Sequence, residues 1–572
     1  MRGHIPALIL IVVVAGGLFA NALGAIFLWD DNKIILENTQ IRDPARVVRA
    51  FGLDYWRRIR AGEGPAADRH YRPVVELSFA ADYAIWESNG VGYHLTGILI
   101  HAATSVLVYL LAYQVLRARL GAALCGLLFA AHPIHVEAIA WTKCRSDLLA
   151  LLFMLASLLL YLRWLRGSSG IHAVLLYVAS LGSFALALGS KASAVVLPAL
   201  AALYLCCFIQ RPRRAMAGLL PFAGIAVAFV AFYAVLSSLP DDANVVTPYQ
   251  RLLTATAVTG AYLRLLVVPT GLCLVHDFGI PRSPSEPNVL LALPWIVASV
   301  GGVAAAFRRS RPALFALAWL LVAMVPISTM PQGLRRLVAD SRAYAPSVGF
   351  CLLVALLLTS VPALGRAPSV RRALQKASLV LAALLLAAYA GLTIDRNVDW
   401  TDHTRLFAHT LARNPRMYDL RIDLASHHIM RGELELAIPH LRHVVAHRPD
   451  HARALRNLAR ACRYTGRYDE AIIYYSRGLR QQPRDPDLRV GLGIACAETG
   501  RYAEAIEQFE AALRLDPLSA ETHYSIGVAH EMMGNRGEAV RWYRKATELA
   551  GPAAAMAKER LAELDAAEAT PR

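Results

Sequence analysis

The sequence predicts an all-α protein in two parts, a polytopic bundle of about eleven membrane helices followed by a soluble superhelix of helical repeats. The 572 residues are 56% hydrophobic, with a mean hydropathy of +0.41, which is far above the average of soluble proteins. The apolar residues gather in runs long enough to span a bilayer. After residue 395 the composition becomes polar and a 34-residue period begins.

The first apolar run, residues 5–28, carries no charge over its 24 residues, so it can cross a hydrocarbon core of about 30 Å. Because it is long and lacks a clear cleavage site, we expect it to remain as the first span. Ten further runs have similar length and composition. They are residues 92–115, 120–140, 146–162, 172–189, 194–209, 215–239, 288–307, 312–330, 343–363 and 377–394.

The net charge of +17 comes largely from arginines in short clusters between the apolar runs and in the C-terminal third. No basic face with interleaved aromatic residues is present, so we expect no nucleic-acid partner. If the eleven runs alternate in direction, the clusters fall on one side, which is typical of cytoplasmic loops. The N-terminus is then cytoplasmic, and the 29–91 loop and the repeats are periplasmic. The Ala- and Arg-rich composition favours a bacterial inner membrane.

Residues 251–271 are hydrophobic enough to be a span, but a crossing there would reverse every later loop. Arg251, Arg264 and Pro269 suit a segment that does not cross. We therefore interpret this stretch as a re-entrant or surface helix, and its crossing stays open.

The repeats are marked by glycines, alanines and prolines that recur every 34 residues. A turn glycine, a small residue where two helices touch and a proline between units are the tetratricopeptide pattern. We expect a transmembrane domain at 1–395, a linker or first helix at 396–417, four repeats at 418–553 and a C-terminal helix or tail at 554–572. Such arrays bind a peptide or partner protein. The recurring residues are Gly432, Gly466, Gly500, Gly534, Ala437, Ala471, Ala505, Ala539, Pro415, Pro449, Pro483 and Pro517.

Asp30 and Asp31 end the first span abruptly. Two carboxylates fixed beside an apolar face suit an enzyme that deprotonates a hydroxyl while its other substrate is linked to a lipid. The alternative is that they only end the helix in water.

A second polar stretch, residues 132–147, lies in the outer loop between the third and fourth spans. His132, His135 and Glu137 can provide metal ligands, although their spacing is not a well-defined ligand pattern. A hydrogen-bonded loop is the second interpretation. The third is an active-site wall in which Arg145 or Lys143 meets a phosphate.

Further basic residues lie on the outer side, against the usual charge bias. Lys191, at a span end, is either an anchor at the membrane surface or a phosphate ligand. Arg342 and Tyr344 precede another apolar run, close to Arg335, Arg336 and Asp340. The phosphate or pyrophosphate of a polyprenyl lipid is the candidate partner for these cations.

Together these motifs resemble the transmembrane-and-tetratricopeptide family, which is related to the protein O-mannosyltransferases among the C-type glycosyltransferases. The resemblance covers nearly the whole chain and implies a polyprenyl-phosphate sugar donor, an inverting transfer on the outer face and an acidic pair after the first span. The motifs are residues 29–32, 72–73, 92–94, 132–141, 145–150, 191–194 and 344–350, followed by the repeats.

Carried over residue by residue, the resemblance implies that Asp30 is the general base and that Asp31 orients the acceptor or the base. Residues of the second loop, His132, His135, Glu137, Arg145 and Asp147, match the family motif. Two departures stand out. The Lys-Glu-Ser of relatives reads Lys-Ala-Ser at 191–193, and their Glu-Arg-Tyr-Leu-Tyr-Leu-Pro-Ser reads Asp-Ser-Arg-Ala-Tyr-Ala-Pro-Ser at 340–347, which displaces the arginine by one position.

Three functions remain open. The first is a glycosyltransferase that moves a hexose such as mannose to a hydroxyl acceptor, with the repeats recruiting a protein. The second is a non-catalytic membrane scaffold for protein assembly, and the third is a glycolipid or cell-wall sugar transferase. The partners are a polyprenyl-phosphate sugar, a protein or peptide and membrane lipid. No cofactor is certain, and a divalent cation is possible because a metal can replace an arginine at the leaving phosphate.

Overall fold

The computed structural model describes residues 2–43, 47, 52, 71–167, 169–210, 212–237, 246–328, 336–361 and 367–569. Every regular element in these ranges is a helix, which confirms the all-α class. The chain divides into two compact units, Met1–Asn414 and Pro415–Arg572. The first is called the membrane unit below, and the second the repeat unit.

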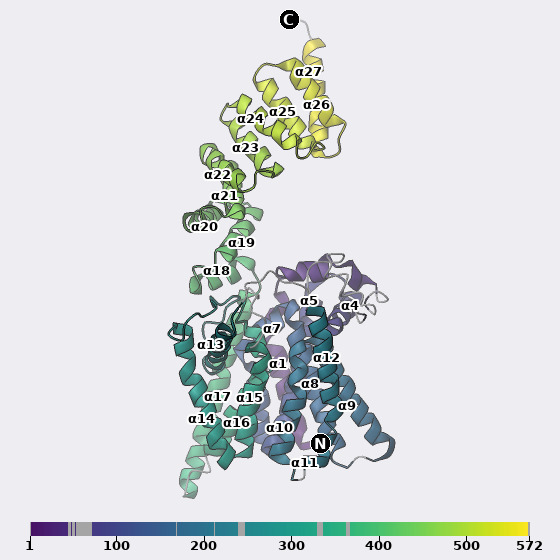
Figure 1. Ribbon diagram of the computed structural model, residues 1–572, viewed down its shortest axis with the longest axis vertical. Coiled ribbons are helices and arrows are strands. Elements are labelled where there is room, and N and C mark those ends of the chain that lie inside the picture. The colour runs from purple at the N-terminus through teal and green to yellow at the C-terminus, as the bar shows by residue number, and fades with distance from the viewer. Residues whose placement is uncertain are drawn as a thin grey trace. The chain divides into compact units, whose positions relative to one another are not determined.

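The membrane unit is a bundle of long, roughly aligned helices with shorter helices at its ends (Figure 1). Its helices are α1 (Ile5–Leu18), α4 (Pro73–Trp86), α5 (Gly90–Leu116), α6 (Arg119–Ala131), α7 (Val136–Ala140), α8 (Arg145–Trp164), α9 (Gly170–Ser190), α10 (Leu197–Phe208), α11 (Pro212–Ala217), α12 (Leu220–Ser237), α13 (Pro248–Val267), α14 (Pro287–Arg309), α15 (Arg311–Ser328), α16 (Ser347–Ser360), α17 (Pro368–Asp399) and α18 (His403–Arg413).

Eight helical stretches in the described residues are long and apolar enough to cross a membrane, so the chain is a multi-pass membrane protein. A ninth span forms if α6 and the helical residues Pro133–Ala140 count as one, although they are bent by 47°. Pro133 accounts for the bend, because proline cannot donate the next helical hydrogen bond. The other two of the eleven expected runs are the shorter apolar helices Ala192–Phe208 and Ser347–Ser360.

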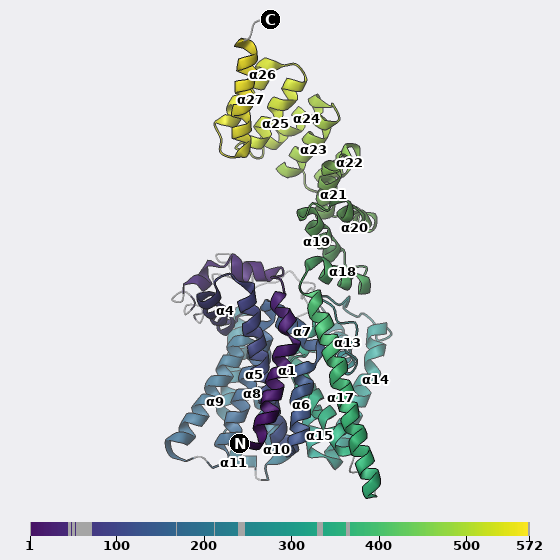
Figure 2. The same cartoon turned by 180° about the vertical axis from the view of Figure 1, so that it is seen from behind.

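The basic loops gather at one end of the bundle. The Arg119 guanidinium lies against the backbone of Gly3, and Arg166 donates a hydrogen bond to the Gln114 side chain. Arg371 lines the same cavity as Leu120, beside Arg119. Figures 1 and 2 show the N-terminus and α11 at this end, whereas α4 and α7 lie at the other.

Helix α13 covers most of the segment that we interpreted as re-entrant or surface-lying. It starts at a capping box formed by Thr247 and Gln250, and it is not among the eight candidate spans of the described residues. Gly260 lets α13 approach α14 closely, since a side chain there would meet the backbone of Ala292.

The repeat unit consists of four helix pairs and a final helix. The pairs are α19 (Tyr418–Met430) with α20 (Leu434–His447), α21 (Ala452–Tyr464) with α22 (Tyr468–Gln481), α23 (Pro486–Glu498) with α24 (Tyr502–Leu513), and α25 (Ala520–Met532) with α26 (Arg536–Thr547). Helix α27 (Pro552–Ala569) packs on the last pair.

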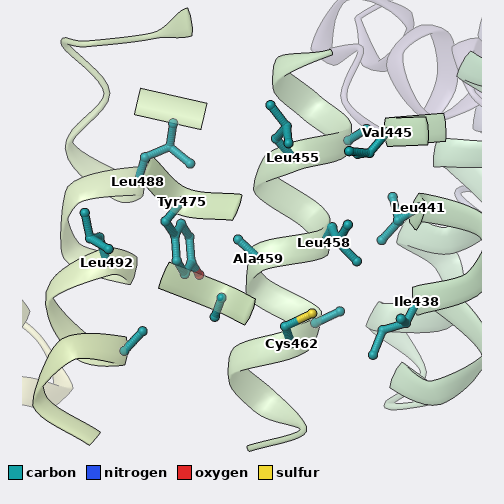
Figure 3. Close-up of a cluster of buried hydrophobic side chains, with 14 of the residues drawn as sticks. Ile438, Leu441, Val445, Leu455, Leu458, Ala459, Cys462, Tyr475, Leu488 and Leu492 are labelled. Atoms are coloured by element: carbon teal, nitrogen blue, oxygen red, sulfur yellow. The ribbon is translucent and has the colours of Figure 1, made fainter. Parts of the chain in front are cut away.

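The 34-residue period is visible in the backbone and in the core. The turn glycines at 432, 466, 500 and 534 have φ between +75° and +79°, a left-handed conformation that favours glycine. The period's alanines at 437, 471, 505 and 539 are fully buried. Figure 3 shows Leu455, Leu458 and Cys462 of α21 between Tyr475 and Ile438 in one continuous core. The tetratricopeptide prediction is confirmed.

Candidate functional site

The seven residues from Trp141 to Asp147 connect three other parts of the membrane unit. Trp141 ends α7, a short 3-10 helix covers Thr142–Cys144, and α8 begins at Arg145. Within this connector Lys143 pairs with Asp30, Arg145 with Asp82, and Asp147 with Lys191. The connector therefore holds the end of the first span, helix α4 and the end of α9 together.

Asp30 and Lys143 form the accessible part of this site. The Lys143 ammonium pairs with one carboxylate oxygen of Asp30, and the two side chains are 27% and 35% exposed, lysine first. Lys143 also lies 5.9 Å from the centre of the Trp141 ring. The Asp30 carboxylate is thus accessible at the membrane surface, where a carboxylate can accept a proton from a bound hydroxyl.

Asp31 has a different environment, because it is completely buried. One carboxylate oxygen accepts the backbone N–H of Leu28 at 3.1 Å, and the other accepts that of Lys143 at 2.8 Å. Burial raises the pKa of Asp31 to about 7, although these two hydrogen bonds act against the rise. Asp31 thus holds the connector against the end of the first span and positions Lys143 opposite Asp30.

The turn that presents the two aspartates has an unusual backbone. Trp29 adopts φ +45°, which non-glycine residues rarely do. Its ring stacks on Phe407 with centroids 5.6 Å apart and meets Trp141 edge-on at 6.0 Å. These ring contacts hold the strained turn, so Asp30 and Asp31 point to different surroundings.

Arg145 is enclosed, being only 2% exposed. Its guanidinium pairs with Asp82, donates to the carbonyl of Tyr93 at 2.8 Å and lies 4.8 Å from the centre of the Phe79 ring. Burial raises the pKa of Asp82, and the attraction of Arg145 reduces that rise. Of the two candidates for a phosphate contact, Lys143 is therefore the accessible one.

Asp147 and Lys191 form a second ion pair, 2.5 Å long and mostly buried. Burial lowers the pKa of Lys191, as do the nearby charges of Arg72 and Arg342, while Asp147 raises it. Arg342 is half-buried and donates to the carbonyl of Leu337 at 2.9 Å. Lys191, Arg72 and Arg342 thus bring positive charges close to one another here, with Asp147 paired to the lysine, and such a cluster of cations attracts an anionic ligand.

Glu137 anchors the 336–341 segment from the inside. Its buried carboxylate accepts hydrogen bonds, each of 3.1 Å, from the Arg336 guanidinium, the Ser341 hydroxyl and the backbone N–H of Asp340. Because Arg342 directly follows this segment, Glu137 also fixes the place from which that arginine extends.

The two histidines of the connecting loop point to separate partners. His132 lies 3.1 Å from the carbonyl of Leu266 and accepts the N–H of Ile134, and His135 lies 2.9 Å from the Ser347 hydroxyl. Within the described ranges, no three His, Cys, Asp or Glu side chains are grouped so that they could hold a metal ion. His132, His135 and Glu137 each have hydrogen-bond partners in the bundle.

Tyr344 is also internal, because its buried hydroxyl bonds to Nδ1 of His101 at 2.8 Å. The structure thus brings Asp30, Asp31, Arg145 and Asp147 together through the connector. Lys191 joins them through Asp147, and Arg342 lies close enough to Lys191 to interact with it electrostatically. His132, His135 and Tyr344 instead form hydrogen bonds inside the bundle.

Two residues of this site were not singled out from the sequence. Asp82 is one of only two carboxylates, with Glu76, in the largely apolar residues 73–86, and a carboxylate in such surroundings is a usable signal for a buried partner. His276 lies 2.7 Å from Asp340. Burial lowers the pKa of His276, but Asp340 outweighs this and raises it to about 10. No sequence pattern links residues 64 positions apart.

Comparisons with known proteins agree with both units. The Tetratricopeptide repeat family model matches residues 422–486, 466–520 and 490–554. Protein O-mannosyl-transferase TMTC3 of Homo sapiens is 24% identical over 84% of this chain and 56% of its own length. Protein O-mannosyl-transferase F38B6.6 of Caenorhabditis elegans is 26% identical over 59% of this chain and 49% of its own.

The expected resemblance is thus confirmed over most of the chain, at 24–26% identity. Protein O-mannosyl-transferase TMTC2 of Mus musculus is more similar, 36% identical, but over 26% of this chain and 17% of its own length. The chain spans about half the length of the curated relatives that match most of it. Among solved structures, MamA matches 25% of this chain and 79% of its own at 26% identity, with a TM-score of 0.25.

Proposed function

We propose that this protein is a membrane glycosyltransferase that moves a hexose such as mannose from a polyprenyl-phosphate donor to a hydroxyl of a protein acceptor. The observation that carries the proposal is the connector Trp141–Asp147, which joins an accessible carboxylate at the end of one span to a group of cations at the end of another. The names of the relatives support this activity.

Asp30 acts as the general base. The acceptor O–H gives its proton to the Asp30 carboxylate while the acceptor oxygen bonds to the anomeric carbon of the sugar. The bond between that carbon and the phosphate oxygen breaks, and polyprenyl phosphate leaves with the electron pair. The attack comes from the face opposite the phosphate, so the anomeric configuration inverts.

The leaving phosphate is stabilised by Lys191 and Arg342. Both lie close enough to interact electrostatically, and Asp147 holds the lysine in place. Arg342 substitutes for the family's arginine, displaced by one position. Since phosphate is already a good leaving group, positioning and charge stabilisation are the main tasks of the protein.

The side-chain cations take the role that a divalent cation would have. Transfer measured in EDTA tests this assignment, and we expect activity within about twofold of the untreated sample. Loss of transfer in EDTA, restored by Mg²⁺ or Mn²⁺, would assign the leaving-group charge to a metal instead.

The active face is the periplasmic side of a bacterial inner membrane, with the N-terminus in the cytoplasm. A cysteine introduced at Asp277, an exposed position in the loop after α13, tests this orientation. We expect a membrane-impermeant maleimide added to spheroplasts to label it. Labelling only after lysis would place this loop inside.

The repeats recruit the acceptor protein. Deletion of the repeat unit tests this role, and it must begin at Pro415, because α18 belongs to the membrane unit through the stacking of Phe407 on Trp29. We expect transfer to protein to fall at least tenfold. Transfer to a glycolipid acceptor that survives the deletion would favour the glycolipid or cell-wall alternative.

The primary experiment compares wild type with Asp30→Asn in membranes supplied with a panel of radiolabelled polyprenyl-phosphate hexoses. Asn keeps the shape of the side chain but cannot accept a proton, so we expect at least a hundredfold loss of transfer with similar abundance. Asp277→Asn, an exposed carboxylate in the loop after α13, is the matched control and retains activity.

Full activity of Asp30→Asn removes Asp30 as the base. No transfer by correctly inserted wild type, with any donor of the panel, favours the non-catalytic scaffold.

A further inference from the structure

The 34-residue period allows the first helices of the four repeats to be compared position by position, and α21 differs from the others. Four of its positions are arginine: Arg453, Arg456, Arg460 and Arg463. The equivalent positions in α19, α23 and α25 hold apolar, hydroxyl or acidic residues. They are Asp419, Ile422, Ser426 and Ile429, then Asp487, Val490, Ile494 and Ala497, then Glu521, Tyr524, Val528 and Glu531.

The four arginines lie on one face of α21, the arginine face below. At 100° per residue they fall within about 80° of arc. The opposite face is the buried one, and Figure 3 shows Leu455, Leu458 and Cys462 directed into the core. The arginines therefore lie away from the hydrophobic core, although the Arg463 side chain hydrogen-bonds to Tyr475 at its edge.

Neighbouring helices neutralise two of the four. Arg453 pairs with Asp423 of α19, and Arg456 pairs with Asp485 at the start of α23. Arg460 is exposed and Arg463 is half-buried, and in the described part of the chain neither forms an ion pair with a carboxylate. The Cβ atoms of Arg460 and Arg463 lie about 5–6 Å apart on the helix. Two neighbouring positive charges are thus available to bind a ligand.

The surroundings of these two arginines restrict what can bind. Tyr464 is 58% exposed beside them, with the Arg463 guanidinium 4.3 Å from its ring centre. The adjoining helices α19 and α23 pack against α21 and contribute the partly buried side chains of Ile429, Val490 and Ile494. The ligand therefore meets two positive charges within a partly apolar surface.

Carboxylates limit the length of the positive region. Asp419 of α19 and both Asp487 and Glu498 of α23 are exposed. A long polyanion, such as a nucleic acid, would meet these charges as soon as it extended past α21. A short acidic cluster would not.

We propose that the arginine face binds a short protein segment that carries two or three adjacent Asp or Glu residues flanked by apolar side chains. Arg460 and Arg463 pair with the carboxylates, since planar guanidinium groups match carboxylate geometry. Tyr464, Ile429 and Ile494 contact the flanking apolar side chains. The inference concerns binding alone, so it holds whether or not the membrane unit transfers sugar.

The test uses the full-length protein in detergent and a fluorescein-labelled peptide, Gly-Leu-Glu-Glu-Asp-Val-Leu-Gly. A second peptide has Gln and Asn in place of its three acidic residues. Fluorescence anisotropy measures binding to wild type and to the double variant Arg460→Glu, Arg463→Glu. The matched control is Arg480→Glu, Arg514→Glu, which makes the same charge change at exposed positions that are equivalent in neighbouring repeats.

We expect the acidic peptide to bind wild type and the control variant within twofold of each other, and the Arg460, Arg463 variant at least tenfold more weakly. The neutral peptide should bind no better than that variant. Circular dichroism and size exclusion confirm that the variants remain folded. We expect them to, because neither arginine is part of the hydrophobic core, and Arg463 meets it only through its hydrogen bond with Tyr475.

Three results would overturn the proposal. Equal weakening by both double variants would show an effect of net charge alone. Equal affinity for the neutral peptide would show apolar binding. Vesicles with 30% phosphatidylglycerol that bind through Arg460 and Arg463, without binding of the peptide, would assign the arginine face to a lipid surface.

Discussion

The two units place their charged groups in opposite ways. In the membrane unit, the pairs of Arg145 with Asp82 and of Lys191 with Asp147 are almost closed off from solvent and join elements far apart in the chain. In the repeat unit, pairs such as Arg442 with Glu470 and Arg467 with Glu435 are solvent-exposed and join adjacent repeats. A buried pair must be complete, because a single remaining charge has no water around it. An exposed pair adds little to stability, so either of its residues can be replaced at small cost.

The largest effect that follows from this contrast is the loss of Asp82. Asp82→Ala leaves the buried Arg145 guanidinium without its carboxylate, so we expect the free energy of unfolding to fall by about 3–5 kcal/mol. Chemical unfolding in detergent measures it, and hydrogen exchange should locate the damage in α4, α5 and α8.

The double variant Asp82→Leu, Arg145→Met provides the control. It replaces the pair by apolar side chains, and we expect it to recover much of the loss. A double variant as unstable as Asp82→Ala would show that packing, rather than the unpaired charge, sets the cost.

A comparable effect in the repeat unit requires a core residue instead of a charge. Leu458→Ala removes a completely buried side chain of α21 and should cost about 2–5 kcal/mol. Hydrogen exchange would show the loss in α19 to α24, with the membrane unit unchanged. Faster exchange at Asp30 and Asp31 would contradict the independence of the two units.

The units also differ in how their carboxylates respond to pH. In the folded state the pKa of Asp31 is raised to about 7, so the folded protein binds a proton that the unfolded chain releases. Stability from this group is therefore greatest near pH 4, falls as the pH rises towards 7 and is constant above that, a total of about 4 kcal/mol. In the repeat unit, Arg560 and Tyr543 lower the pKa of Glu531, which leaves no slope in this range.

Unfolding measured at pH 5, 6, 7 and 8 tests this difference. Between pH 5 and 6 the wild type should lose stability, whereas Asp31→Asn should show a flat profile. Above about pH 6.5 both should lose stability, because the pKa of His276 is raised to about 10 in the folded protein. A slope between pH 5 and 6 that persists in Asp31→Asn would assign that titration to another group.

The smallest effect is expected at the exposed pairs. Arg442→Ala removes the partner of Glu470 on the surface of the repeat unit and should change stability by less than about 1 kcal/mol. Thermal unfolding in low and in high salt measures it. A loss as large as that of Asp82→Ala would remove the distinction between the two units.

The repeat unit could be predicted almost completely from the sequence, because its information is local and repeated. Gly466 lies one period after Gly432, and both adopt the same φ, so one repeat predicts the next. The apolar spans were predictable for a similar reason, since length and composition are enough to identify them.

The site is only partly predictable, because its partners are set by the tertiary fold. Asp30 and Lys143 could be selected from motifs, but their contact crosses 113 positions of the chain. The contact of Glu137 with Arg336 crosses 199. Burial also separated two adjacent residues, since Asp30 is accessible and Asp31 is enclosed. The positive φ of Trp29 produces that separation, and composition does not reveal it.

The equal φ of the four turn glycines has a consequence for how this array can change in length. A cut at one turn glycine and a join at the next removes 34 residues and leaves the same backbone angle at the junction. Unequal recombination within the coding region can therefore add or remove a repeat in one step, without a new junction having to be optimised. The membrane unit has no equivalent route, because each of its ion pairs joins unique residues.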